Sequence, residues 1–137
     1  MSEAAAKVQP APPTPYEMLG GEAAVRALAD AFYDAMDALP QAATIRAMHG
    51  ESLAEIKEKL FEYLSGWLGG PRLYYQKYGS VCLGHAHAPY AIGRAERDQW
   101  LACMEAALQA VDASEEVRQI LRHPMYRMAN ALRTRDD

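Results

Sequence analysis

Residues 83–100 read LGHAHAPYAIGRAERDQW, and this stretch decides how the rest of the chain is interpreted. Residues 83–92 lack a helical pattern, whereas the residues from Gly93 onward begin one. His87 therefore lies on a short connection between two long helices with apolar faces. From such a connection an imidazole can reach an iron atom held in a pocket between the helices, so we interpret His87 as a candidate iron ligand. A lone histidine is more often structural or exposed, and this interpretation needs support from the rest of the chain.

The composition describes one soluble globular domain. The chain has 137 residues, of which 50% are hydrophobic and 23% charged, enough to bury a full core. A net charge of -4 with scattered arginines argues against nucleic acid as a partner, because phosphate binding needs a concentrated basic face. No apolar run approaches the roughly 18 residues of a membrane helix and no signal core is visible, so we expect a cytoplasmic protein without a membrane segment. Cys82 and Cys103 form no Cys-x-x-Cys pair and are expected to be free thiols.

Two parts of the chain differ in composition. Residues 1–15 are rich in Ala and Pro and hold too few large apolar side chains to offset the entropy of ordering, so we expect a flexible tail. The folded domain is expected to cover residues 16–137. Gly20 and Gly21 can adopt positive φ, and this pair predicts a turn between two helices.

Apolar residues at three- and four-residue spacing predict four main helices and no sheet, which is an all-α fold. The first helix is expected to end at Pro40. The second opens with Ser52 and Glu55 in a capping-box arrangement and stops at residues 69–71, which are Gly-Gly-Pro. The apolar faces of these two helices consist of Val25, Leu28, Ala29, Phe32, Met36 and Leu39, and of Leu53, Ile56, Leu60, Tyr63, Leu64 and Trp67.

The third and fourth helices follow the stretch around His87. The third is expected over residues 94–111, and its early acid Glu96 suits the helix dipole. The fourth begins at the cap Ser114, and Pro124 is expected to kink or interrupt it because proline lacks a backbone donor. Their apolar faces consist of Trp100, Met104, Ala107, Leu108 and Val111, and of Val117, Ile120, Leu121, Met125, Met128 and Leu132.

Residues 73–83 are the part of the chain with an ambiguous pattern. Their tyrosines and Val81 have strand propensity, and Gly79 breaks a helix. An isolated hairpin is one interpretation. We expect instead a loop with a short helical turn around residues 83–87, because a lone hairpin would have no partner sheet.

Over about residues 16–132 the chain resembles the truncated haemoglobins, and within them the second, or O-type, group. The resemblance implies a truncated globin fold, in which two antiparallel helix pairs are stacked around haem in a two-over-two arrangement. In that family the helix that bears the iron ligand is reduced to a turn. The motifs that carry the resemblance are Gly20-Gly21, Phe32-Tyr33, Trp67-Leu68-Gly69-Gly70-Pro71, His87-Ala88-Pro89-Tyr90-Ala91-Ile92 and Glu96-Arg97-Asp98-Gln99-Trp100-Leu101.

The same resemblance assigns roles to individual residues. It implies that His87 is the proximal ligand of the iron of haem b, and that Trp100, thirteen positions later, is the tryptophan typical of the second group. Tyr33 matches the distal tyrosine of the first long helix. His49 falls at the corner before the next helix, where relatives carry Tyr, His or Phe. Tyr33, His49 and Trp100 would then face the bound gas and donate hydrogen bonds to it.

Further residues are expected to contact the haem. Lys59 is a candidate partner for a haem propionate. The chain has Gly84 and Ala86 where relatives often carry arginines before the proximal histidine, so Tyr74, Tyr78 or Arg94 are alternative propionate partners. The apolar faces of the haem are expected to contact Leu60, Phe61, Leu64, Leu83, Ile92 and Met104, besides Trp100.

The expected function is reversible binding of O2, and of other diatomic ligands such as CO and NO, at an iron ligated by His87. A polar distal pocket suits oxygen, NO or peroxide chemistry better than bulk oxygen transport. No paired general acid and base is visible, and the sequence leaves open whether the chain is an enzyme, peroxidase-like or NO-detoxifying. Such chemistry needs a reductase as a partner, which the sequence does not identify, and the chain is expected to be a monomer or a homodimer.

Two other classes of function remain open at this point. A non-haem metal-binding enzyme would use the His85-Ala86-His87 pair with His49 or a distant carboxylate, a spacing that suits a strand. A helical interaction protein without a cofactor would use Trp67 and Trp100 for packing or for a partner surface. An absorption spectrum separates these classes, since only a haem protein has the intense band near the violet edge.

Overall fold

The computed structural model describes residues 11–79 and 87–137. Within these ranges all regular structure is helical and no strand is formed. The helices, with the 3-10 turn η1, are α2 (Pro15–Leu19), α3 (Glu22–Ala38), η1 (Pro40–Ala42), α4 (Ala43–Ala47), α5 (Ala54–Trp67), α6 (Leu73–Tyr78), α8 (Arg94–Ala110) and α9 (Glu115–Ala131). The prediction of an all-α fold is confirmed for the described ranges.

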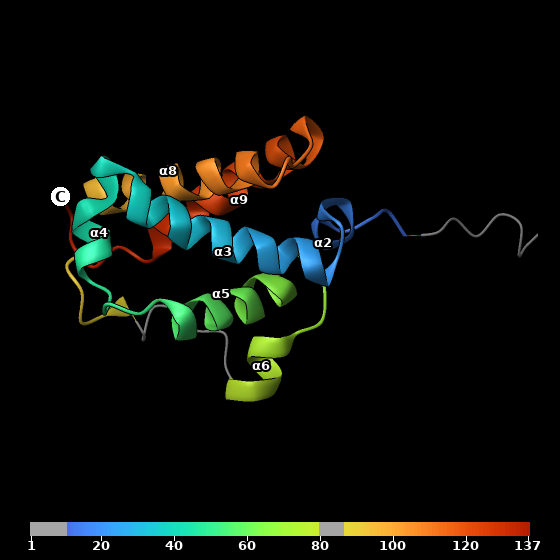
Figure 1. Ribbon diagram of the computed structural model, residues 1–137, viewed down its shortest axis with the longest axis horizontal. Coiled ribbons are helices and arrows are strands. Elements are labelled where there is room, and N and C mark those ends of the chain that lie inside the picture. The colour runs from blue at the N-terminus through green and yellow to red at the C-terminus, as the bar shows by residue number, and fades with distance from the viewer. Residues whose placement is uncertain (1–10, 80–86) are drawn as a thin grey trace, which may run out of the picture.

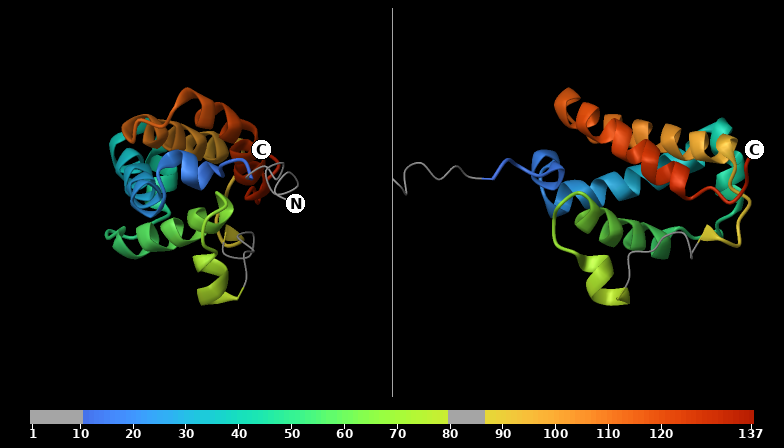
Figure 2. Two further views of the ribbon diagram at one scale, coloured as in Figure 1. Left: turned by 90° about the vertical axis from the view of Figure 1, so that its right-hand side faces the viewer. Right: turned by 180° about the vertical axis from the view of Figure 1, so that it is seen from behind.

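The four long helices form two antiparallel pairs, α3 with α5 and α8 with α9 (Figure 1). Helix α3 packs against both α5 and α8, so it joins the two pairs. Figure 2 shows the same layers from the end and from behind, with α8 and α9 on one side of α3 and α5 on the other. This is the expected two-over-two arrangement.

The core is built around α3 because one side of this helix is apolar throughout. Val25, Leu28 and Phe32 are each at most 1% exposed, and Met36 is 2% exposed. They meet Cys103, Met104, Ala107 and Leu108 of α8 and Phe61 and Leu64 of α5 in one cluster. Full burial of a Leu, Val or Phe side chain contributes about 1.5–3 kcal/mol, so this cluster dominates the stability of the fold.

Most helix ends lie where glycine, proline and serine predict them. Gly20 and Gly21 have φ of 120° and 85° and turn the chain from α2 into α3, as expected. Helix α3 ends at Ala38, just before Pro40. The Ser114 Oγ accepts a hydrogen bond from the Val117 N–H at 3.2 Å and caps α9, which confirms that prediction.

The capping box expected at the start of α5 is wrong, and so is the interruption that was one of the two outcomes expected at Pro124, beside a kink. No side chain caps α5, because Leu53 occupies the N-cap and the Ser52 Oγ accepts only from the Ala54 N–H at 3.4 Å. Helix α9 continues through Pro124 without interruption. Pro124 leaves the carbonyl of Ile120 without its helical donor, but both residues are exposed, so water can satisfy that carbonyl.

Residues 73–78 form the helix α6, so both the loop and the hairpin expected there are wrong. Packing of aromatic rings overrides their strand propensity: the ring of Tyr74 lies 5.7 Å from that of Tyr63 on α5 and 4.5 Å from that of Tyr78. Gly79, with φ of 73°, ends the helix. The helical turn expected at residues 83–87 lies outside the described residues except for His87. Cys82, Leu83, Gly84, His85 and Ala86 all lie outside them.

Two further expectations concern the membrane and the cysteines. None of the helices that the structure describes is both long and apolar enough to cross a membrane. Cys103 is a free thiol, fully buried in α8, and burial raises its pKa to about 11.

Candidate functional site

A cavity of about 370 Å³ lies between the two helix pairs and the segment that leads from His87 to α8. This volume is within the range of small-molecule and cofactor sites. Much of its wall is apolar and comes from Phe32, Met36, Ile45, Ile56, Leu60 and Met128.

His87 and Ile92, both expected near the iron, line this cavity. His87 is half-buried and directly follows the undescribed residues 80–86. Its carbonyl accepts a hydrogen bond from the Tyr90 N–H at 3.0 Å, which closes a tight turn after the histidine. The segment 87–93 therefore places one imidazole in the cavity wall.

Tyr33, His49 and Trp100 line the same cavity, and Tyr33 and Trp100 both pack on Phe32. The ring of Phe32 lies 5.0 Å from that of Tyr33 and 5.1 Å from that of Trp100. The rings of Tyr33 and His49 are 5.6 Å apart and meet edge to face. Residues from α3, from the connection before α5 and from α8 thus converge, and the structure brings together the four polar residues singled out in the sequence.

The Tyr33 side chain is only 5% exposed. Burial raises the pKa of its phenol well above the usual range, so the hydroxyl keeps its proton at any physiological pH. Within the described ranges the structure shows no hydrogen bond to this hydroxyl. Tyr33 is therefore a neutral donor in the cavity wall, available to a ligand.

His49 has a different hydrogen-bonding role from the one expected. Its Nδ1 lies 2.8 Å from the Ile45 carbonyl oxygen, and a carbonyl can only accept, so Nδ1 carries the proton. In the neutral ring Nε2 is then an acceptor. Of the three residues expected to donate to a bound gas, neutral His49 can only accept at its second nitrogen.

Arg46 holds the connection on which His49 lies. Its guanidinium donates to Asp37 Oδ1 at 2.5 Å, and to the carbonyls of Gly50 at 2.9 Å and Glu51 at 3.1 Å. One side chain thus ties residues 49–51 to α3. Nothing in the sequence singles out Arg46, since no spacing rule connects it with Asp37 or with backbone carbonyls.

The other residues expected at the haem fall into three groups. Leu60 and Lys59 line the cavity, and Lys59 also pairs with Glu55 at 3.5 Å. Tyr74, one of the alternative propionate partners, lines the cavity, whereas Tyr78 and Arg94 are not in its wall. The residues that lie in the core rather than in the cavity wall are Phe61, Leu64 and Met104.

Phe61 and Leu83 differ from the rest of the expected apolar contacts. Phe61 was expected to contact the cofactor. The guanidinium of Arg26 lies over its ring at 4.0 Å and occupies one face of that ring. Leu83 lies outside the described residues.

Arg97 is a second residue that sequence reasoning missed, and it lies in the cavity wall. Its side chain is 11% exposed and donates to Asn130 Oδ1 at 2.9 Å and to the Tyr126 hydroxyl at 3.2 Å, which joins α8 to α9. Arg97 belongs to the motif that begins α8, but nothing in the sequence distinguishes it from an exposed helix arginine.

The alternative of a non-haem metal site has no support in the part of the chain that the structure describes. No three His, Cys, Asp or Glu side chains gather there to hold a metal ion. His85, the other half of the His-x-His pair, lies outside the described residues, and the strand that such a pair needs is not found in the described ranges.

Comparison with known proteins agrees with this geometry. The model of the bacterial-like globin family matches residues 14–134. The group 2 truncated hemoglobin YjbI of Bacillus subtilis (strain 168) is 33% identical over 107 residues, which is 78% of each chain.

Two solved structures are similar over nearly the whole chain. The group II 2-on-2 hemoglobin of the plant pathogen Agrobacterium tumefaciens has a TM-score of 0.86 and 38% identity, covering 95% of this chain and 100% of that chain. The cold-adapted truncated hemoglobin of the Antarctic bacterium Pseudoalteromonas haloplanktis TAC125 also has a TM-score of 0.86 and 38% identity, covering 90% and 99%. From the family match, the identities and the shared fold, the chain belongs to the bacterial-like globins and, within them, to the group II truncated haemoglobins.

Proposed function

We propose that this globin holds haem b in the cavity between its helix pairs, with His87 as the proximal ligand, and binds O2 and other diatomic gases such as CO and NO. The haem iron, when bound, supplies the centre to which such a gas coordinates. One observation carries the proposal: His87 lines the same cavity as Tyr33, His49 and Trp100.

The residues of the cavity fit the cofactor. The wall combines apolar side chains, which suit the flat faces of a porphyrin, with one imidazole from the loop that precedes α8. Lys59 and Arg97 supply positive charge in the same wall and are the candidate partners for the two propionates.

The distal side chains act as hydrogen-bond partners for the gas. The Tyr33 phenol and the Trp100 indole each offer a donor to a ligand that gains negative charge. A hydrogen bond to a charged group contributes about 1.5–3 kcal/mol, so each aligned donor slows release of the ligand by about ten- to a hundredfold.

The acceptor at His49 Nε2 adds a second kind of contact, because it can take a hydrogen bond from a protonated ligand such as a peroxide. A pocket with donors and an acceptor suits oxygen, NO or peroxide chemistry better than oxygen transport. Turnover of this kind requires an electron donor, so we propose a reductase as partner. We further propose that the protein acts in the cytoplasm as a monomer or homodimer.

The absorption spectrum of the purified protein, with and without added haem, tests the proposal. We expect an intense band near the violet edge in the wild type and in His123→Ala, whose histidine is exposed on α9. His87→Ala is expected to lose haem or to hold it exchangeably. A wild-type protein that takes up no haem would overturn the cofactor, and an unchanged spectrum in His87→Ala would show that the ligand lies elsewhere.

A further inference from the structure

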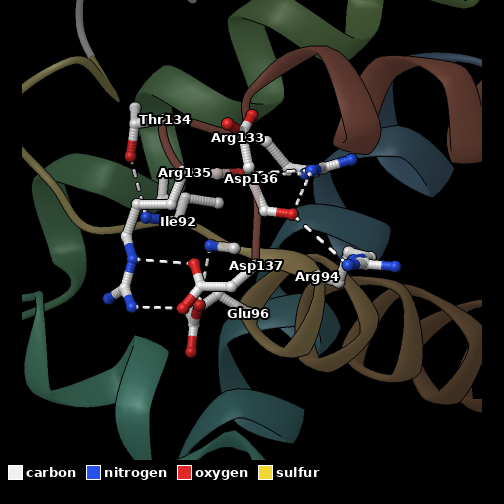
Figure 3. A network of polar contacts seen from close by, with 9 residues as sticks. Ile92, Arg94, Glu96, Arg133, Thr134, Arg135, Asp136 and Asp137 are labelled. Atoms are coloured by element: carbon white, nitrogen blue, oxygen red, sulfur yellow. Dashed lines mark hydrogen bonds and ion pairs between the residues drawn. The ribbon is translucent and has the colours of Figure 1, made fainter.

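The segment that follows α9 is bonded to the loop between His87 and α8 (Figure 3). We call residues 133–137 the clasp. The Thr134 hydroxyl donates to the Tyr90 carbonyl at 2.5 Å and accepts from the Ile92 N–H at 2.9 Å. The backbone N–H groups of Thr134 and Arg135 both donate to the Ile92 carbonyl, at 2.8 and 3.1 Å. One threonine thus bridges two peptide groups within five residues of His87.

The clasp is held in shape by its own side chains. The Arg135 guanidinium pairs with both carboxylate oxygens of Asp137, at 2.9 and 2.5 Å. Arg133 donates to the carbonyls of Arg135 and Asp136 at distances of 3.1–3.3 Å. Arg94, the first residue of α8, donates to the Asp136 carbonyl at 3.4 Å. These contacts join the clasp to the start of α8 as well as to the loop.

The loop also meets the clasp at Gly93. A Cβ atom on this residue would lie 2.9 Å from the backbone carbon of Asp137, closer than real contacts allow. The Gly93 N–H donates to Glu96 Oε1 at 2.7 Å, which caps α8. The end of the loop is therefore enclosed between the cap of α8 and the clasp.

Packing alone does not fix the middle of this loop. Residues 88–91 are exposed, and the Tyr90 side chain is 43% exposed although it also contributes to the cavity wall. Among the described residues, the hydrogen bond to the Tyr90 carbonyl from outside the loop comes from the hydroxyl of Thr134. Thr134 thus ties the exposed part of the loop to the clasp.

We propose that Thr134 is a positioning residue for the iron ligand, which holds the loop so that the His87 imidazole has one fixed approach to the iron. This inference rests on the proposed function, in which His87 binds haem. Contacts behind a metal ligand orient it and tune the metal bond, and a ligand fixed in advance needs less ordering when the metal binds.

The test compares Thr134→Val, which keeps the shape but removes the hydroxyl, with Thr134→Ser, which keeps the hydroxyl. In Thr134→Val we expect haem to leave about five- to tenfold faster. The resonance Raman band of the iron–imidazole bond should also shift or broaden. Thr134→Ser should match the wild type in both, as should Thr44→Val, a control at an exposed threonine of α4.

A measurement without haem follows the loop itself. In the apoprotein, exchange of the Ile92 amide hydrogen should speed up in Thr134→Val and not in Thr134→Ser, because this amide donates to the lost hydroxyl. Equal haem loss, Raman bands and exchange in the two variants would overturn the role of Thr134. The proposed function fails in a different way, namely if His87→Ala keeps the iron–imidazole band.

Discussion

The Tyr33 hydroxyl has no hydrogen-bond partner in the part of the chain that the structure describes, although its side chain is only 5% exposed. The hydroxyl oxygen is nevertheless not among the fully buried polar atoms that lack a partner, so it reaches the space of the cavity. A ligand in the cavity can therefore supply the acceptor. Trp100 of α8 lines the same cavity, and its indole offers a donor only.

Replacing Tyr33 or Trp100 by Phe removes one donor each and leaves an aromatic ring in place. We expect oxygen to dissociate about ten- to a hundredfold faster from each ferrous variant, because a hydrogen bond to a charged ligand contributes about 1.5–3 kcal/mol. Stopped-flow displacement of oxygen measures the rate. Tyr75→Phe, at an exposed tyrosine of α6, is the control, and unchanged rates in both test variants would remove the proposed distal role.

Because of Tyr33, the free energy of unfolding is expected to depend on pH in the alkaline range. Its pKa in the folded state lies well above the ordinary value of 10.0 because of burial, so above that pH the unfolded chain releases a proton that the folded protein keeps. The wild type should therefore lose up to about 1.4 kcal/mol more unfolding free energy per pH unit than Tyr33→Phe. Urea denaturation near pH 9, 10 and 11 measures the difference in unfolding free energy between the wild type and Tyr33→Phe. This difference should be constant below about pH 9 and change above it. A difference that stays constant up to pH 11 would contradict the prediction.

Single residues of the site were predictable from the sequence to an uneven degree. His87, Tyr33 and Trp100 stand in the motifs that carry the resemblance, whereas His49 was matched only by its place at the corner before a helix. All four line one cavity. The tautomer of His49 depends on a backbone carbonyl and has no sequence signal. Arg46 and Arg97 act through partners on other elements or on the backbone, so only the folded structure reveals them.

At the scale of elements, Arg46 ties the connection between α4 and α5 to the rest of the fold. The guanidinium bonds the carbonyls of Gly50 and Glu51 as well as Asp37 on α3. His49, on the same connection, lines the cavity. The position of His49 is therefore linked to an ion pair whose arginine side chain is 25% exposed.

Arg46→Ala is expected to destabilise the protein by about 1–2 kcal/mol, because several hydrogen bonds to one charged group are lost at a partly exposed site. It should also speed the association of CO, since His49 then moves more freely. Arg46→Lys should restore little of the lost stability, because one ammonium group cannot donate to all the acceptors that the planar guanidinium reaches. Flash photolysis and thermal unfolding measure the two effects. Arg127→Ala, at an exposed arginine of α9, is the control, and equal CO rates in all variants would separate Arg46 from the site.

Glycine, proline and a serine cap predicted most element ends because these residues act locally. The start of α5 and the helix α6 were not predictable in the same way. Ser52 matches the capping pattern but lies one residue before the N-cap, and α6 is helical because its tyrosines pack on α5 and on one another. Both outcomes depend on contacts between elements, which override local propensity.

For the whole molecule, the topology followed from the resemblance to a known family, since periodicity alone gives four helices and not their order in space. The structure adds that the cavity and the core share α3. Phe32 and Met36 belong to the buried cluster and also line the cavity. Binding in the cavity and stability of the fold are therefore coupled through the same side chains.

Removal of haem is accordingly expected to lower the stability of the whole domain. Without haem the apolar side chains of the cavity wall face water or a void, and either costs free energy. We expect the apoprotein to collapse partly around the site and to unfold at a much lower temperature, with the loss greatest near the cavity. Circular dichroism of apo and reconstituted protein measures the shift, and the difference should grow with haem concentration, as expected when a ligand binds the folded state alone. Equal unfolding temperatures for the two forms would show that the cavity and the core are independent.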